Sequence, residues 1–370
     1  MKRLLLFVTT VMILDACASN AVSSSEDKAC KDRKGWYGHE LYGNVASVTK
    51  KTYDLNMKFG EETLGELKSS HQYVFNEAGD VIKEVYTHYS SSGESFGYAG
   101  VNVYDDKRNI LETTTYNYEG EISGKYINEF DDQGNRISES HYGSDGKLEA
   151  KIIFKYNENG KCIARSDYDA EGVLETQYLL EYDERGNNVS EKVYGSDNAL
   201  IKRILRTFND DDKCIEYKEF EIIAINSDVD LYAVADTCVV TGIELNRNRG
   251  KDIKLPNDSG VSLFDERSVA GKSVEESIVR WYKFAYDDHA NLNGGYELAA
   301  DGTHKNKYIC SYKDGKVSEL VNYDSLGMMT AKEIILRDQH GNVIESTEYE
   351  YKGPIEFPSQ KTIYEIEYFE

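Results

Sequence analysis

Proline is scarce in this sequence, whereas tyrosine is abundant. The 370 residues include 3 prolines, 2 tryptophans and 29 tyrosines. Proline removes a donor from the hydrogen-bonded ladder of a sheet, so its near absence leaves long stretches able to form strands. Tyrosine packs well on a half-buried pleated surface. The composition therefore favours extended β-sheet.

Positive charge is also in short supply. The chain has 43 lysine and arginine residues against 66 aspartate and glutamate residues, which gives a formal net charge of −23. An anionic surface repels the phosphate backbone of DNA and RNA. We therefore expect no nucleic-acid partner.

Long apolar runs are missing beyond the N-terminus. No stretch after residue 16 reaches the ~18 consecutive apolar residues that mark a membrane-spanning helix. At the N-terminus, Lys2 and Arg3 precede a mostly apolar run, 4–14. This run has the length of a secretory signal and is too short to span a bilayer. The sequence therefore predicts an exported protein.

The signal ends in Leu14-Asp15-Ala16-Cys17, which resembles the lipobox of bacterial lipoproteins. The resemblance implies that 1–16 is a lipoprotein signal peptide and that Cys17, the first mature residue, carries the lipid. Residues 17–35 then comprise this cysteine and a flexible tether. Because Ala18 replaces the aspartate that retains enterobacterial lipoproteins at the inner membrane, the resemblance implies a lipid anchor in the outer membrane of the cell envelope, facing the periplasm or the surface. The alternative is an ordinary signal peptide that is cleaved nearby.

A period of 26 residues runs through the chain. An aromatic residue followed by a polar turn recurs at this spacing, and we call these residues the anchors. The anchors are Tyr104, Phe130, Tyr156, Tyr182 and Phe208. A second aromatic residue follows each anchor after 12 residues, again usually before a turn. Asp or Asn opens these turns and Gly closes them, which is typical of a type I turn with a bulge. The pattern therefore predicts that each 26-residue unit contains two turns and two strands.

The segments between the turns alternate as strands do. Leu148, Ala150, Ile152 and Phe154 share one face with Tyr156, whereas the opposite face is largely polar. Turns every 12 to 14 residues leave no room for helices. We therefore predict an all-β fold, an antiparallel tandem β-hairpin repeat array with a 26-residue period, in either an elongated or a spirally curled sheet.

The repeat register divides the chain into segments. Residues 36–70 are expected to form N-terminal capping strands that shield an open edge of the array. Repeat block 1 covers 71–221 and repeat block 2 covers 284–357. Between them, 222–283 is either an irregular excursion or two eroded repeats, and 358–370 ends the chain as a strand or tail.

An odd number of cysteines remains once Cys17 is assigned to lipid, so they cannot all pair within one chain. They are Cys30, Cys162, Cys214, Cys238 and Cys310. Cys162 and Cys214 hold the same repeat position two units apart, which places them four strands, or about 19 Å, apart in a meander. A disulfide requires Cα atoms within ~7 Å of each other. We therefore predict that these two cysteines do not pair.

No motif in the sequence has the structural context that catalysis requires. Gly93-Glu-Ser95-Phe-Gly97 has the spacing of a nucleophile elbow, but no helix signal follows it. Ala270-Gly-Lys-Ser273 ends like a P-loop but lacks the first glycine and the strand–loop–helix frame. The seven histidines show no metal-ligand spacing. We expect a non-enzymatic protein without metal, nucleotide or other cofactor.

The turns Tyr182-Asp-Glu-Arg-Gly-Asn187 and Phe130-Asp-Asp-Gln-Gly-Asn135 resemble the YD repeats of bacterial RHS proteins. The segment from Tyr142 to Leu148 is similar to the Tyr-x-x-x-Gly-Lys-Leu units of MORN-like repeat proteins. The resemblance covers 75–221 and 284–353, and its specific part is the tandem register. It implies extended β-sheet that binds carbohydrate or a protein partner, with no enzymatic activity attached.

These observations indicate a cell-envelope lipoprotein that presents a long β-repeat surface to a glycan or an envelope protein. Stacked aromatic rings on a sheet can bind sugar rings or peptide chains, although tyrosine more often simply fills a half-buried face. The candidate binding surface comprises Tyr104, Phe130, Tyr156, Tyr182 and Tyr178. Two alternatives stay open: a purely structural or assembly role in the envelope, and a hydrolase with its site in 222–283.

Overall fold

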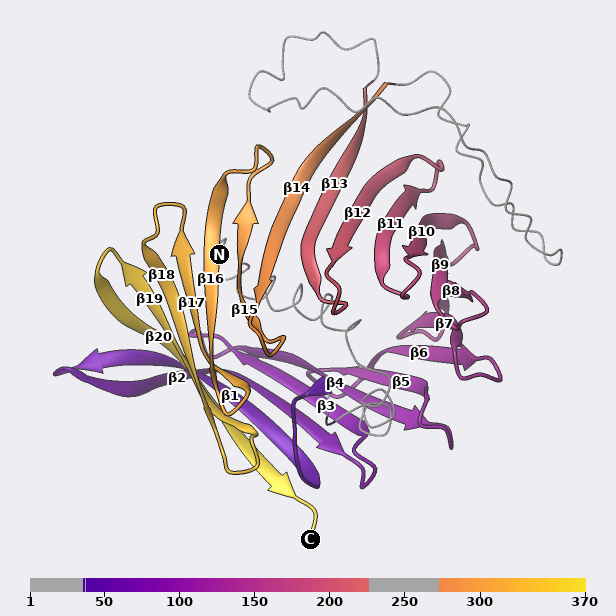
Figure 1. Ribbon diagram of the computed structural model, residues 1–370. Coiled ribbons are helices and arrows are strands. Elements are labelled where there is room, and N and C mark those ends of the chain that lie inside the picture. The colour runs from indigo at the N-terminus through magenta and orange to yellow at the C-terminus, as the bar shows by residue number, and fades with distance from the viewer. Residues whose placement is uncertain (1–35, 37, 226–272) are drawn as a thin grey trace.

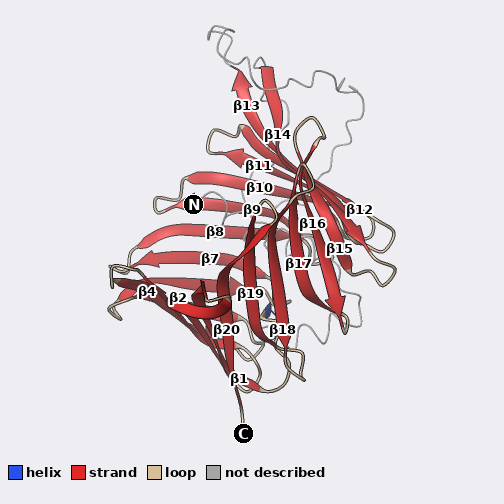
Figure 2. Cartoon of the chain, turned by 90° about the vertical axis from the view of Figure 1, so that its left-hand side faces the viewer, coloured by secondary structure: helices blue, strands red, loops and turns tan. Residues whose placement is uncertain are grey.

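The computed structural model describes Trp36, 38–225 and 273–370, and most of these residues belong to β-strands joined by short turns (Figure 1, Figure 2). Each of the 20 strands pairs with its neighbours in antiparallel fashion. The predicted all-β hairpin array is therefore confirmed. Within the described residues, no helix is long and apolar enough to span a membrane.

The strands follow one another along the chain at the spacing that the repeat predicts. In the N-terminal half they are β1 Val45–Lys58, β2 Glu61–Phe75, β3 Val81–Tyr89, β4 Ser95–Tyr104, β5 Ile110–Asn117, β6 Ile122–Phe130, β7 Arg136–Gly143, β8 Leu148–Tyr156, β9 Cys162–Asp169 and β10 Leu174–Tyr182. In the C-terminal half they are β11 Asn188–Gly195, β12 Leu200–Phe208, β13 Cys214–Ile225, β14 Ser273–Tyr286, β15 Leu292–Leu298, β16 His304–Lys313, β17 Lys316–Asp324, β18 Met329–Arg337, β19 Val343–Lys352 and β20 Ile355–Tyr368.

The sheet closes on itself, which the sequence did not indicate. β1 lies between β2 and β20, and its pairing with β20 runs from Val45 to Asp54. Residues 36–70, expected to shield an open edge, instead supply the strands that join the two ends of the array. Closure gives the edge strands a partner and removes the unpaired donors and acceptors that an open sheet exposes.

The first turn of most repeats is a type I turn with a bulge, as predicted, whereas the turn after Tyr312 is a two-residue turn, Asp314-Gly315. In one example, the Asp131 amide donates to the Asn135 carbonyl at 2.9 Å, and Gly134 adopts a φ of 85°. The Asp131 carboxylate accepts the amides of Gln133 and Asn135 at 3.0 and 2.8 Å. The Asn135 side-chain amide also donates to this carboxylate at 2.9 Å, and this bond, followed by the backbone bonds, lowers the pKa of Asp131 because it favours the charged form. The bulge shifts the register between Glu129 and Phe130.

Some turns adopt the same conformation without glycine. Arg108, Asp212 and Ala290 stand where other repeats have Gly, and their φ angles are 66°, 57° and 61°. A left-handed conformation costs an L-residue about 1 kcal/mol or more. The sheet pairing on either side therefore imposes the turn even where the residue opposes it.

The two repeat blocks are continuous in space. β13 and β14 pair directly from Glu216 to Ile225, so the ladder passes from one block to the other without an intervening strand. The predicted irregular excursion, 222–283, lies mostly outside the described residues, since 226–272 is not described. Its two ends, 222–225 and 273–283, extend β13 and β14.

The cysteine positions agree with the repeat register. Cys162 begins β9 and Cys214 begins β13, so the two lie four strands apart. Cys162 is free, and its thiol lies 3.5 Å from the Ala164 carbonyl oxygen. Cys30 and Cys238 lie outside the described residues, as does Cys17.

We expect a matched pair of turn substitutions to have opposite effects on stability. A Cβ at Gly134 would meet nothing within 4 Å. Gly134→Ala should therefore lower the free energy of unfolding by about 1 kcal/mol through its backbone conformation alone. Ala290→Gly relieves the same strain and should leave stability equal or higher. Urea unfolding followed by circular dichroism measures both, and equal losses for the two variants would contradict this account.

The contribution of Glu348 to stability should fall as pH rises from about 4.5 to 7. Glu348 lies directly opposite Glu333 on the neighbouring strand, and burial, followed by repulsion from Glu333, raises the pKa of Glu348 to about 7. A carboxyl with a raised pKa favours folding while it is protonated, so this contribution is lost between about pH 4.5 and 7. Glu348→Gln should stabilise the fold at pH 8 by about 1–2 kcal/mol, allowing for solvent screening, and change little at pH 4.5. Glu175→Gln, at an exposed glutamate, is the control. A difference in Tm between Glu348→Gln and the native chain that stays the same at pH 4.5 and pH 8 would contradict the raised pKa of Glu348.

Candidate functional site

The anchors lie on one face of the sheet, which we call the anchor face, and most of them bond to the neighbouring repeat. The phenol hydroxyls of Tyr104, Tyr156 and Tyr182 donate to backbone carbonyls at 2.7, 2.8 and 2.7 Å. For Tyr156 and Tyr182 the acceptor is the sixth residue after the preceding anchor, and Tyr286 bonds in the same way to Cys214, six residues after Phe208. Burial raises the pKa of Tyr104 to about 12. These hydroxyls therefore link successive hairpins.

The candidate binding residues fall into two groups. Tyr104 and Phe130 line a pocket, whereas Tyr156, Tyr182 and Tyr178 lie farther along the sheet, away from it. One face of the Tyr178 ring is covered by the Arg165 guanidinium, which lies 5.1 Å from the ring centre. The pocket brings the first two together with residues that the sequence had not singled out.

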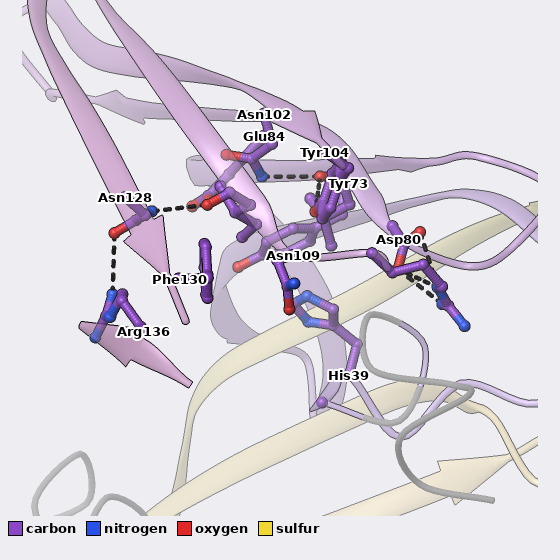
Figure 3. Close-up of a pocket in the computed structure, with 14 residues that line it drawn as sticks. His39, Tyr73, Asp80, Glu84, Asn102, Tyr104, Asn109, Asn128, Phe130 and Arg136 are labelled. Atoms are coloured by element: carbon purple, nitrogen blue, oxygen red, sulfur yellow. Dashed lines mark hydrogen bonds and ion pairs between the residues drawn. The ribbon is translucent and has the colours of Figure 1, made fainter. Parts of the chain in front are cut away.

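The pocket has a volume of about 550 Å³ and lies over β2 to β7 on the anchor face (Figure 3). Its size is within the usual range for small-ligand sites. Figure 3 shows Asn128 and Arg136 at one end and Asp80 at the other. The lining residues are Gly38, His39, Tyr73, Asp80, Val81, Glu84, Asn102, Tyr104, Arg108, Asn109, Ile110, Asn128, Phe130 and Arg136.

One end of the pocket is fixed by a buried ion pair. The Arg108 guanidinium donates to both oxygens of Asp80, with Nη2 2.7 Å from Oδ1 and Nε 3.1 Å from Oδ2. It also donates to the Ala78 carbonyl at 2.7 Å. Asp80 is 3% exposed, so this bidentate pair is well desolvated and joins the turns before β3 and β5.

A cluster of rings and one carboxylate forms the wall beside β2. Glu84 accepts hydrogen bonds from His71 at 2.6 Å and from the Tyr98 hydroxyl at 2.7 Å. The His71 bond is the main reason that the pKa of Glu84 lies below its usual value. His39 stacks against Tyr73 with ring centres 4.0 Å apart. Burial, with help from nearby Lys50, lowers the pKa of His39 to about 4, so His39 is neutral at pH 7.

Two amides at equivalent repeat positions complete the site. Asn102 donates to the Val81 carbonyl at 2.8 Å, and Asn128 donates to the Ile110 carbonyl at 2.9 Å. Each precedes its anchor by two residues, where later repeats have Phe154 and Leu180. This departure from the repeat consensus is the signal by which the sequence could have revealed the site. His39 gave no such signal, because it lies outside the repeat, in the segment before β1 that packs over Tyr73.

The pocket combines apolar ring faces with oriented polar groups. Phe130 and Tyr104 supply rings, and the amides of Asn102 and Asn128 are held by neighbouring backbone. The lining contains two carboxylates, Asp80 and Glu84, and two guanidinium groups, Arg108 and Arg136, so the formal charges of the lining cancel. In the part of the chain that the structure describes, no group of three His, Cys, Asp or Glu side chains could hold a metal ion.

Comparison with known proteins gives one short family match. The model of a family described as a protein of unknown function (DUF2963) matches residues 122–168, which comprise β6 to β9. No curated protein matches the chain.

Several solved structures are distantly similar. A porin-like protein from Bacteroides uniformis is 11% identical, with 87% of this chain and 96% of that chain covered and a TM-score of 0.31. The complex TcdB2-TccC3-Cdc42 is 10% identical, with 85% and 20% covered and a TM-score of 0.24. A Tc holotoxin pore from Photorhabdus luminescens is 9% identical, with 85% and 19% covered and a TM-score of 0.25. This chain spans about a fifth of the toxin chains, and likenesses at this level carry no functional argument.

Proposed function

We propose that this chain is a non-enzymatic lipoprotein of the cell envelope whose anchor face binds a neutral glycan. The lipobox-like Leu14-Asp15-Ala16-Cys17 and the tether 17–35 support the location in the outer membrane. The pocket over β2 to β7 is the observation that carries the binding role. A kinship with the YD repeats of RHS proteins is part of the same proposal, since the tandem turns motivate both.

The chemistry of the pocket suits a sugar better than a charged ligand. The chain as a whole is strongly acidic, yet the formal charges of the pocket lining balance, so the lining itself selects neither a cation nor an anion. Ring faces can pack against the apolar faces of a pyranose, and fixed amides can bond its hydroxyls. The hydroxyl of Tyr104 is already bonded to Val81, so this residue contributes its ring.

In this proposal the candidate aromatic residues outside the pocket stabilise the fold. Tyr156 and Tyr182 use their hydroxyls to join hairpins, and Tyr178 packs under Arg165. Binding therefore concentrates at Tyr104 and Phe130 rather than along the whole row. If this surface binds no glycan, the alternative ligand is a protein partner in the envelope.

Loss of one pocket ring should abolish most glycan binding. Phe130→Ala should weaken the binding of any glycan captured on an array by at least about tenfold, as expected for removing a buried aromatic contact. Phe208→Ala alters the same repeat position outside the pocket and is the matched control. Affinity is measured by calorimetry, and far-UV circular dichroism checks both folds. A blank array, or equal loss in both variants, would refute the glycan site, and hydrolysis of the bound glycan would refute the non-enzymatic role.

Lipidation should depend on Cys17 alone. Cells fed radiolabelled or alkyne-tagged palmitate should label the native chain, and Cys17→Ser should lose the label and leave the membrane fraction. Acyl chains stabilise membrane binding by ~0.8 kcal/mol per buried methylene. The apolar signal peptide is removed on maturation, so the lipid on Cys17 is what holds the mature chain in the membrane fraction. Ala18→Ser serves as the control. Labelling that survives in Cys17→Ser would contradict the anchor, and a secreted, unlabelled native chain would indicate an ordinary signal peptide.

A further inference from the structure

Exposed apolar side chains gather at the tips of five hairpins that are consecutive around the closed sheet. The hairpins are β17–β18, β19–β20, β1–β2, β3–β4 and β5–β6, and all five turn at the same rim. Their most exposed apolar residues are Leu326, Ile355, Phe59, Phe96 and Tyr118, at 85, 58, 106, 59 and 54% exposure. We call these five hairpin ends the apolar tips. Three of the hairpins stand along the left edge of Figure 1.

The opposite rim differs in the side chains that its turns expose. Turns at both rims use Asp or Asn that bond their own backbone, as at Asp131 and Asp183 on the opposite rim and at Asn117 and Asp324 on the rim of the apolar tips. The exposed residues at the ends of the turns on the opposite rim are polar, for example Lys107, Gln133 and Arg185. The two rims come from the same repeat, so the apolar tips are not a general property of its turns.

Phe59 occupies a backbone conformation that does not suit it. Lys58 pairs with Glu61, so Phe59 and Gly60 form a two-residue turn, with φ angles of 55° and 85°. Such turns favour Asn-Gly, because Asn tolerates a positive φ and bulky residues do not. The Phe59 side chain is fully exposed and gains no packing in exchange. Folding therefore gives no reason for phenylalanine at this position.

The β1–β2 hairpin also extends beyond its neighbours. β1 leaves β20 after Asp54, and β2 meets β3 only from Ser69, so 55–68 pairs within the hairpin alone. Figure 1 shows this hairpin projecting past the adjacent strands. A two-stranded hairpin in water is marginally stable by itself. A partner at its tip would supply the missing burial.

We propose that the apolar tips dock onto a zwitterionic phospholipid surface. Neighbouring tips stand about 10 Å apart, two strand spacings, and charged residues such as Lys58 and Glu61 separate them. A protein interface has a contiguous apolar centre, whereas a bilayer accepts single apolar side chains wherever they meet it. Exposed Glu62 and Glu121 beside the tips would repel anionic lipid, which selects a zwitterionic surface.

Docking does not require the lipid on Cys17. An acyl chain on that residue would raise the local concentration of membrane and strengthen the contact. The tip contacts are nevertheless a separate interaction, so the test is made in a Cys17→Ser chain. Failure of the lipid anchor then cannot cause failure of the docking, and labelling with palmitate reports on the anchor by itself.

The test places tryptophan at the tips. Phe59→Trp and Leu326→Trp, each in the chain 17–370 that carries Cys17→Ser and lacks the apolar signal, are mixed with phosphatidylcholine vesicles whose acyl chains carry bromine, which quenches tryptophan. The control is Gln133→Trp on the polar rim, and the signals of Trp36 and Trp281 are subtracted with the unsubstituted chain. We expect the added emission at both tips to fall by about half or more and that at residue 133 to stay unchanged.

A second variant separates docking from folding. Phe59→Asn suits the turn and should raise Tm, yet it should weaken vesicle binding by about tenfold, because it removes a buried aromatic ring. Unquenched tips, or equal quenching at residue 133, would overturn the proposal. So would vesicle binding that Phe59→Asn leaves intact. The tip tryptophans could instead shift their emission to the blue without vesicles while the mass in solution doubles. That result would show that the apolar tips bind a second copy of this chain instead of lipid.

Discussion

The pairing of β1 with β20 is the interaction on which the rest of the structure depends. It joins the two ends of a long hairpin array and leaves no strand edge open among the described strands. A twisted array of this length has two exposed edges unless it closes, and each edge invites association with other chains. Closure also fixes which repeats become neighbours, because β1 and β2 carry the sheet from β20 to β3.

Closure and the anchor hydroxyls together determine where a ligand can bind. From β7 to β13 on the anchor face, arginine side chains cover aromatic rings, as Arg136 covers Phe154 and Arg206 covers Tyr217. Over β2 to β7 the amides of Asn102 and Asn128 replace bulky side chains at the equivalent positions. The pocket is thus a local departure from a regular pattern, and the segment before β1 borders it through His39.

In our proposals the two rims of the sheet have different roles. Turns at the polar rim satisfy their own backbone groups and lower the pKa of aspartates such as Asp131 and Asp287. Hairpins at the other rim carry Phe59 and Leu326 into solvent, where they contribute nothing to the core. One repeat sequence can therefore form a uniform sheet and still present different chemistry at its two ends, since turn residues are free of the packing that constrains strand residues.

The sequence by itself determined the strands, the turns and their register, because period-2 alternation and turn chemistry are local properties. It also placed Cys162 and Cys214 four strands apart and put Tyr104 and Phe130 on one face. Tertiary structure alone decided that the array closes, since the β1–β20 contact joins residues about 300 positions apart in the chain. Tertiary structure also packed His39 against Tyr73, whereas Tyr73 and Glu84 meet through the ordinary pairing of β2 with β3. No local pattern encodes the β1–β20 contact, because it depends on the accumulated twist of every hairpin between the two ends.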